Sequence, residues 1–366
     1  MTLVAKFEIH RLQFLDEHGK AVQPLPEFAR DAKALLPLYR WMVLMRAYDA
    51  KAVALQRTGQ LGTFASLLGQ EAINAGIASA MRPEDTFLMT YRENGAQLMR
   101  GVTLREFFLY WGGDERGSDF SGPRHDFPIC VTIAAHATHA VGAAYAMKLR
   151  RERRVAVCAL GDGASSKGDF YEGLNAAGVW KLPLVFVVTD NQWAISVPRK
   201  RQSATQTLAQ KAIAAGMEGV QVDGNDVVAV RHAMDQALAK ARDGGGPTLI
   251  EALTYRLSDH TTADDASRYR SADEVAEAWK REPVLRLRNH LIACGVWSRE
   301  KEEGLLRECN EEVQASVQAY LDTPAPSVEQ MFDHLYAKLP AAMEKQRDEV
   351  SSNAEGSDPM TGSDAI

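Results

Sequence analysis

The middle third of the chain alternates apolar runs with segments in which apolar residues recur at helical spacing. The four apolar runs are the expected strands, at residues 155–160, 184–190, 219–224 and 248–256. Helical patterns fill two of the intervals, at residues 168–180 and 226–241. Strands that are apolar along their whole length are covered on both faces, which is typical of parallel sheets connected through helices. The pattern predicts an α/β fold with a parallel sheet flanked by helices.

The flanking thirds are predicted to be mainly helical. Residues 1–32 form a polar arm interrupted by prolines, and residues 33–56 carry dense apolar positions at helical spacing. Further helices are expected from Gly69, over 104–111 and over 133–150. The last of these is so rich in alanine and glycine that it could pack closely against a partner, and a dimer contact is one use for it.

The C-terminal third opens with a long polar segment. Residues 257–271 contain hardly an apolar side chain, and a polar loop of this length in a compact domain is usually functional or disordered. Ser271 and Glu274 then have the spacing of a capping box, and residues 299–320 have a helical apolar face. We expect three parts: the arm 1–32, one domain with C-terminal helices over 33–340, and a polar, disordered tail over 341–366.

The amino-acid composition excludes some classes of function and location. The 366 residues carry 42 lysines and arginines against 48 aspartates and glutamates, a net charge of −6, which disfavours a nucleic-acid-binding role. The four cysteines are widely spaced, which is typical of a reducing compartment. We find neither a signal peptide nor a membrane span, and expect a cytoplasmic or organelle-matrix protein without a membrane partner.

A glycine-rich turn, GDGASSKG at residues 161–168, follows one predicted strand and opens a helix. A helix start of this kind suits a phosphate, because free amides and the helix dipole meet there. A P-loop is excluded because Ser166 replaces its second glycine and Gly168 replaces its serine or threonine. A dinucleotide fingerprint fails at Ser166 as well, which opposes a nicotinamide oxidoreductase.

A magnesium-bound diphosphate fits the turn better. Asp162 follows one strand and Asn191 follows the next, and consecutive parallel strands usually lie side by side with their carboxyl ends at one edge. Carboxylate, amide and carbonyl oxygens are the ligands that Mg²⁺ prefers, together with phosphate oxygens and water.

Each candidate also has an ordinary structural interpretation. Asp162 could cap the following helix, and Arg92, Arg256 and His260 could be surface groups. His136 and His139 are three residues apart, without a supporting carboxylate motif, so packing or hydrogen bonding is the better interpretation than zinc binding. Glu71 could be an interface acid or a buried helix charge, and the sequence leaves this open.

Several motifs, in their order along the chain, resemble those of one protein family. The run GDGASSKGDFYEGLNAAGVWKLPLVFVVTDNQWAIS (161–196) resembles the alpha subunit of heterotetrameric thiamine diphosphate-dependent 2-oxo acid dehydrogenases. The resemblance extends through GQEA (69–72), MTYR (89–92), QTLAQKAIAAGMEGVQVDGND (206–226) and TYRLSDHTTADDASRYR (254–270). It covers about 33–340, so it implies a thiamine diphosphate-binding domain there.

The resemblance implies a role for each matching residue. Asp162, Asn191 and the main-chain oxygen of Trp193 would hold Mg²⁺. The cofactor-binding residues would be Tyr91, Arg92, Val131, Ile133, Gly161, Asp162, Gly163, Ala164, Asn191, Arg256 and His260. Val131 and Ile133 match the segment that touches the aminopyrimidine ring, and His260 would also assist acyl transfer to lipoamide. The chain departs from the family at Asp190, where asparagine is common, and at Trp193, where tyrosine or phenylalanine is common.

The resemblance also implies partners and a reaction. In the family, a beta subunit supplies the glutamate that activates the cofactor, two alpha and two beta chains form a heterotetramer, and the acyl group passes to the lipoyl domain of an acyltransferase. The expected activity is oxidative decarboxylation of pyruvate. Branched-chain 2-oxo acids such as 3-methyl-2-oxobutanoate are the alternative substrates, and a non-catalytic scaffold subunit is the alternative of another class. Thr261 matches a hydroxyl that is phosphorylated in some members. The sequence does not decide whether Thr261 itself is phosphorylated.

Overall fold

The computed structural model describes residues 1–333 and 335–356. The chain forms two compact units, the first over Met1–Gln318 and the second beginning at Ala319. Within the described residues, no helix combines the length and the apolar content that crossing a membrane requires.

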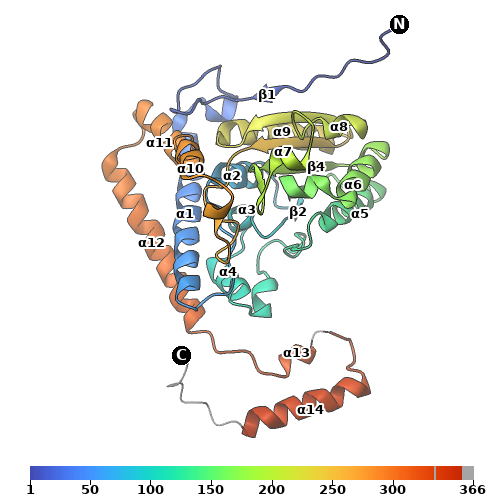
Figure 1. The fold of residues 1–366 in the computed structure, drawn as a ribbon, viewed down its shortest axis with the longest axis vertical. Helices are drawn as coiled ribbons and strands as arrows, with labels where there is room; N and C mark the ends of the chain where they lie inside the picture. The colour runs from blue at the N-terminus through green and yellow to red at the C-terminus, as the bar shows by residue number, and fades with distance from the viewer. Residues whose placement is uncertain (334, 357–366) are drawn as a thin grey trace. The chain divides into compact units, whose positions relative to one another are not determined.

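The first unit is built on a six-stranded parallel sheet in the order β1-β7-β8-β4-β3-β2 (Figure 1). Its strands are β1 (Arg11–Leu12), β2 (Thr86–Leu88), β3 (Ala156–Gly161), β4 (Leu184–Asp190), β7 (Glu218–Asp223) and β8 (Thr248–Leu253). A short antiparallel pair, β5 (Trp193–Ala194) and β6 (Val197–Pro198), lies outside this sheet. The four strands expected in the middle third are confirmed, and β3 pairs directly with β4.

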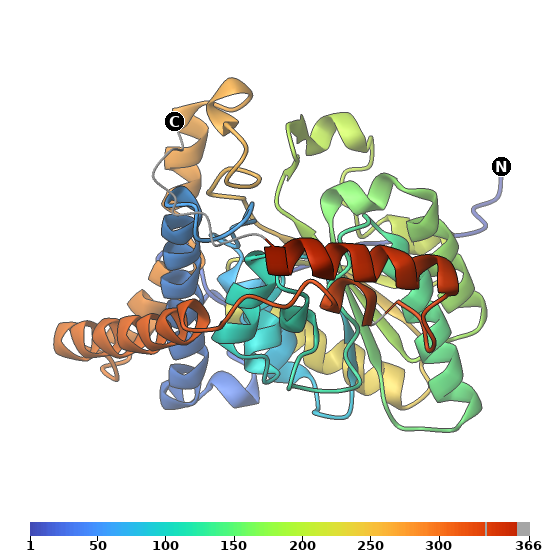
Figure 2. The ribbon, with the colours of Figure 1, turned by 90° about the horizontal axis from the view of Figure 1, so that it is seen from below.

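Helices flank this sheet. The helices of the first unit are α1 (Leu36–Arg57), α2 (Glu71–Ala80), α3 (Asn94–Met99), α4 (Leu104–Trp111), α5 (Ala135–Leu149), α6 (Gly168–Val179), α7 (Arg199–Gln202), α8 (Lys211–Ala214), α9 (Val227–Arg242), α10 (Ala272–Trp279) and α11 (Pro283–Ala293). Helix α12 (Arg299–Leu321) continues across the boundary between the units. Figure 2 shows α1 on the opposite side of the first unit from α5 and α6.

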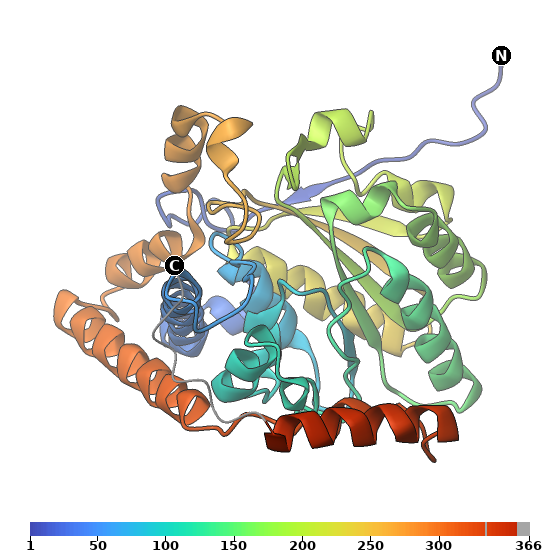
Figure 3. The ribbon, with the colours of Figure 1, turned by 60° about the horizontal axis from the view of Figure 1, so that its bottom comes forward.

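The core has two halves, one on each face of the sheet. Figure 3 shows helices on both sides of that sheet. Successive side chains of a strand point to opposite faces, and β3 shows this directly. Cys158 and Leu160 pack with residues of α5 and α6, whereas Val157 and Ala159 pack with residues of α2 and α9. Both faces of β3 are therefore covered, which explains its continuous apolar sequence.

The N-terminal arm contributes an edge strand that the sequence pattern does not indicate. Arg11 and Leu12 form β1 and pair in parallel with Gln221 and Val222 of β7. Next to this strand, the buried carboxylate of Asp226 accepts hydrogen bonds from the amides of Phe14 and Leu15, each at 2.7 Å. A two-residue strand in a polar segment has no periodic signal, so only tertiary contacts reveal it.

The second unit contains α13 (Gln330–Asp333) and α14 (Ala341–Gly356). Helix α14 occupies the first sixteen residues of the segment expected to be a disordered tail, and the division of the chain into three parts stays a prediction. The sequence of α14 includes several good helix formers, such as Ala341, Glu344 and Lys345, so local propensity favours a helix without an apolar face. Residues 357–366 lie outside the described residues.

Candidate active site

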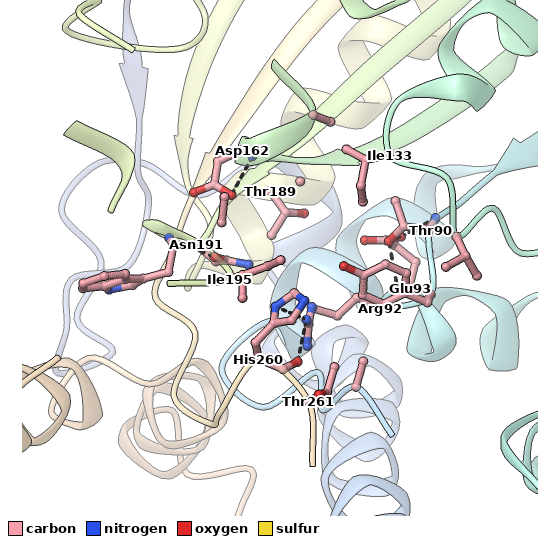
Figure 4. A pocket seen from close by; sticks show the side chains of 18 of the residues that line it. Thr90, Arg92, Glu93, Ile133, Asp162, Thr189, Asn191, Ile195, His260 and Thr261 are labelled. Atoms are coloured by element: carbon pink, nitrogen blue, oxygen red, sulfur yellow. Dashed lines mark hydrogen bonds between the residues drawn. The ribbon is translucent and has the colours of Figure 1, made fainter. Parts of the chain in front are cut away.

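A cavity of about 640 Å³ lies at the carboxyl edge of the sheet, beyond the ends of β3 and β4. Of the predicted site residues, those that line it are Tyr91, Arg92, Val131, Ile133, Gly161, Asp162, Gly163, Ala164, Asn191, Trp193 and His260. Figure 4 shows Asp162 and Asn191 toward one side of the cavity and Arg92 with Glu93 toward the other. The structure thus brings together residues that are up to a hundred and seventy positions apart in the chain.

The glycine-rich turn continues β3 as one turn of 3-10 helix, Asp162–Ser166, before α6 begins at Gly168. Gly163 packs so closely against β5 that a Cβ atom on it would lie 2.8 Å from the Cβ of Ala194. Any side chain at this position would displace β5 or the turn. Glycine is required here because two backbone segments that line the cavity approach each other closely.

Asp162 is the buried acid of this turn. Its Oδ1 accepts a hydrogen bond from the amide of Gly163 at 2.9 Å, whereas its Oδ2 is buried and has no hydrogen-bond partner within residues 1–333 and 335–356. Burial raises the pKa of Asp162 to about 6. A buried carboxylate oxygen without a partner is costly unless a proton or a cation satisfies it, so this atom is suited to binding a metal.

Two further oxygens complete the expected magnesium ligands. The side-chain oxygen of Asn191, which is buried, accepts a hydrogen bond from the amide of Trp193 at 3.2 Å. The carbonyl oxygen of Trp193 accepts one from Nη1 of Arg256 at 3.1 Å. Each carbonyl-type oxygen has a second lone pair. The donor set of one carboxylate and two neutral oxygens therefore fits a hard divalent cation.

His260 lies between two arginines at the other wall of the cavity. Its Nδ1 is 3.3 Å from Nη2 of Arg92 and 3.3 Å from Nη1 of Arg256. Burial, together with the positive charges of these two arginines, lowers the pKa of His260 to about 3. The ring is therefore neutral at physiological pH, and since guanidinium groups only donate, Nδ1 accepts and the proton resides on Nε2.

Arg256, which the family resemblance predicts to bind the diphosphate, does not line the cavity. Its side chain is fully buried behind the wall, and burial lowers its pKa to about 10. Besides Trp193, it donates to the carbonyl of Ile195 at 2.9 Å and to the hydroxyl of Tyr269 at 2.8 Å. It thus joins β5 and its turn to the loop that carries His260.

Arg92, like Arg256, connects separate segments of the chain. It lines the cavity, but its guanidinium also donates to the carbonyls of Ser66 and His260. Its neighbour Tyr91 lies edge-to-face with the imidazole of His260, with ring centroids 6.2 Å apart. Two segments far apart in the sequence are thereby held together at one wall.

Two residues that support this region lack an obvious sequence signal. Glu93, which lines the cavity, accepts hydrogen bonds from the amide and hydroxyl of Thr90 at 2.7 and 2.6 Å, and burial raises its pKa. Lys211 is buried and donates to the carbonyl of Ser165 at 2.6 Å, which fixes the glycine-rich turn from behind. Adjacency to Arg92 could have suggested Glu93, whereas nothing in the sequence around Lys211 indicates its role.

The structure also decides the sequence alternatives for three other residues. Glu71 is a buried helix charge, since it is fully buried and forms an ion pair with Arg46 at 2.8 Å. Nε2 of His136 lies 2.7 Å from the carbonyl of Ala159, and His139 stacks on Phe127. Both histidines therefore hydrogen-bond or pack, as expected.

Comparison with known proteins agrees with this architecture. The family model described as "Dehydrogenase E1 component" matches residues 39–329, so the chain belongs to the dehydrogenase E1 component family. The chain is similar to the pyruvate dehydrogenase E1 component subunit alpha of Acholeplasma laidlawii, with 40% identity over 344 residues that cover 93% of this chain and 99% of that protein.

Two other relatives carry the same description. The chain is 38% identical to the Staphylococcus aureus protein, over 93% of this chain and 92% of that one. It is 37% identical to the Mycoplasma pneumoniae protein, over 92% of this chain and 94% of that one. The family resemblance identified from the sequence motifs is therefore confirmed.

Proposed function

We propose that this chain is the alpha subunit of a pyruvate dehydrogenase and binds thiamine diphosphate through Mg²⁺. One observation carries the proposal: the unpartnered Oδ2 of Asp162 lies in a cavity that Asn191 and Trp193 also line. Family membership and the name shared by the relatives support the reaction class and the substrate.

Different residues of the cavity would hold different parts of the cofactor. Asp162, Asn191 and the carbonyl of Trp193 would hold Mg²⁺, and the Gly161–Ala164 turn would offer amides to the diphosphate. Tyr91 and Arg92 would contact the diphosphate from the opposite wall, with Arg256 supporting that wall from behind. The main chain near Val131 and Ile133 would meet the aminopyrimidine ring.

When bound, thiamine diphosphate supplies the electron sink that decarboxylation of a 2-oxo acid requires. The contribution of this chain is orientation and hydrogen bonding. His260, which is neutral at physiological pH and carries its hydrogen on Nε2, can donate a hydrogen bond from that atom. We assign it to the step in which the acyl group passes to lipoamide.

The site also requires partners. We propose that a beta subunit covers the cavity and supplies the carboxylate that activates the aminopyrimidine, in a heterotetramer of two alpha and two beta chains. A lipoyl domain of the acyltransferase component would receive the acyl group. The bacterial relatives suggest a cytoplasmic location.

The substrate is tested by assembling the chain with its beta subunit and measuring carbon dioxide release. We expect a higher kcat/KM for pyruvate than for 3-methyl-2-oxobutanoate, with thiamine diphosphate and Mg²⁺ present. A preference for 3-methyl-2-oxobutanoate would instead identify a branched-chain enzyme. An assembly that binds neither the cofactor nor the metal would identify a scaffold subunit.

A further inference from the structure

A second cavity, of about 990 Å³, lies at the same edge of the sheet beyond the ends of β7 and β8. Trp193 lines both cavities, and the second also includes residues from α7 and α10. We call it the basic cavity because six basic side chains line it: Arg11, Arg199, Lys200, Arg201, Arg281 and Arg286.

Four acidic side chains also line the basic cavity: Glu17, Asp223, Glu274 and Glu277. Asp223 forms an ion pair with Arg286 at 2.9 Å, and Glu277 forms one with Lys280 at 2.6 Å. Glu274 accepts hydrogen bonds from the indole of Trp193 and the hydroxyl of Tyr255, at 3.3 and 2.9 Å. With six basic and four acidic side chains, the lining keeps an excess of two positive charges.

Three of the basic side chains are exposed at the mouth of the cavity. Among the residues that the structure describes, no carboxylate lies within ion-pair distance of Lys200, Arg201 or Arg281. Lys200 and Arg201 are neighbours in α7, Arg281 follows α10, and all three line the same cavity. An anionic ligand would meet an excess of positive charge there.

Two arginines deeper in the structure have unused donors. Arg286 is 2% exposed, and its Nε is buried without a hydrogen-bond partner among the residues that the structure describes, although Nη1 binds Asp223. The Nη2 of Arg199 is likewise buried and has no hydrogen-bond partner in the described part of the chain, whereas its Nη1 donates to the carbonyl of Thr205 at 2.6 Å and its Nε lies 3.5 Å from Oδ2 of Asp190. Unpaired donors on buried cations are costly, and oxygens of a phosphate group are suitable acceptors.

The remaining walls of the cavity include three aromatic rings, those of Trp193, Tyr255 and Tyr269. Trp193 and Tyr269 pack with their ring centroids 5.3 Å apart. Aromatic side chains beside basic groups offer a stacking surface to a flat heterocycle whose phosphates contact the arginines. The volume also falls in the range of small-molecule sites.

We propose that the basic cavity binds a phosphate-bearing small molecule with a flat ring, of the nucleoside diphosphate class. This site is separate from the cavity proposed for thiamine diphosphate, with which it shares Trp193. The proposal goes beyond the decarboxylation reaction and does not depend on the identity of its substrate.

ADP is the probe for this proposal. The chain is assembled with its beta subunit, saturated with thiamine diphosphate and Mg²⁺, and titrated with ADP in a calorimeter. We expect one ADP per alpha chain, bound more weakly as salt increases because the contacts are charged. The Arg201→Gln/Arg281→Gln variant should raise the Kd at least about tenfold, since two charge-assisted contacts are lost.

The control is Arg150→Gln/Arg153→Gln, which removes two exposed arginines outside the basic cavity and should leave the Kd unchanged. Inorganic pyrophosphate should bind more weakly than ADP, because it cannot stack on the aromatic rings. Absence of ADP binding, equal affinity in all three proteins, or displacement of ADP by excess thiamine diphosphate would each overturn the proposal. Equal affinity for pyrophosphate and ADP would overturn its flat-ring part.

Discussion

Two arginines hold one histidine neutral at the cavity wall. Arg92 and Arg256 both approach Nδ1 of His260, so a proton on that nitrogen would meet two positive charges. The same arginines donate to main-chain carbonyls of neighbouring loops. Orientation of the imidazole and its protonation state therefore come from the same contacts.

This arrangement makes stability depend on pH. The pKa of His260 is about 3 in the folded chain, against about 6.5 in an unfolded one. Between these values the unfolded chain binds more protons, so this residue destabilises the fold increasingly as pH falls below about 6.5. We expect His260→Asn to lose less stability than the wild type between pH 7 and pH 5, measured from urea midpoints.

The control for that measurement is His10→Asn, which changes an exposed histidine in the N-terminal arm. It should follow the wild-type pH dependence. Parallel loss of stability in wild type and His260→Asn would show that His260 ionises alike in the folded and unfolded chains.

The positions of some site residues could be predicted from the sequence, and those of others could not. Asp162 and Asn191 follow adjacent strands, and the rule that parallel strands end at one edge is sufficient to bring them together. Whether a side chain lines the cavity or lies behind its wall depends on tertiary packing. The sequence therefore could not show that Arg256 is buried behind the wall or that Lys211 supports the turn.

At the scale of elements, one carboxylate joins three of them. Asp226 precedes α9 and accepts hydrogen bonds from the amides of Val228 and Ala229 at that helix's start. Its other oxygen binds the amides of Phe14 and Leu15 beside β1. The arm, β7 and α9 are thus connected at a residue that is completely buried.

We expect Asp226→Ala to destabilise the first unit by about 2–4 kcal/mol, because it removes a helix cap and leaves buried amides unpaired. Its control is Asp16→Ala, which removes an acid whose contacts lie within one exposed turn of the arm. Urea unfolding of the assembled protein measures both. Equal midpoints for the two variants would contradict the role assigned to Asp226.

Helices and strands could be predicted from the sequence where burial determines the pattern of apolar and polar residues. Strands β3 and β4 are covered on both faces, so their sequences are continuously apolar and their bounds agree with the expected runs. Edge strand β1 has only two residues, which is too short for a periodic pattern of apolar residues. Helix α14 has no buried side chains among those described, so its sequence has no apolar face either. Their formation depends on pairing with β7 in one case and on helix propensity in the other.

At the scale of the molecule, a chain with a net charge of −6 still gathers six of its basic side chains around one cavity. Arg92 faces the first cavity, and the basic cavity lies beside it at the same edge of the sheet. Both therefore use the position at which parallel α/β sheets commonly bind ligands.

The central claim is that Asp162 holds the metal that anchors thiamine diphosphate. It is tested most directly by the affinity of the chain, assembled with its beta subunit, for thiamine diphosphate with Mg²⁺ and with EDTA. We expect Asp162→Ala to weaken binding by at least about a hundredfold and to abolish its dependence on Mg²⁺, since even outer contacts of a metal site contribute about 10- to 100-fold. Asp169→Ala, outside the cavity, should bind as the wild type does. Unchanged, Mg²⁺-dependent affinity in Asp162→Ala would contradict the account.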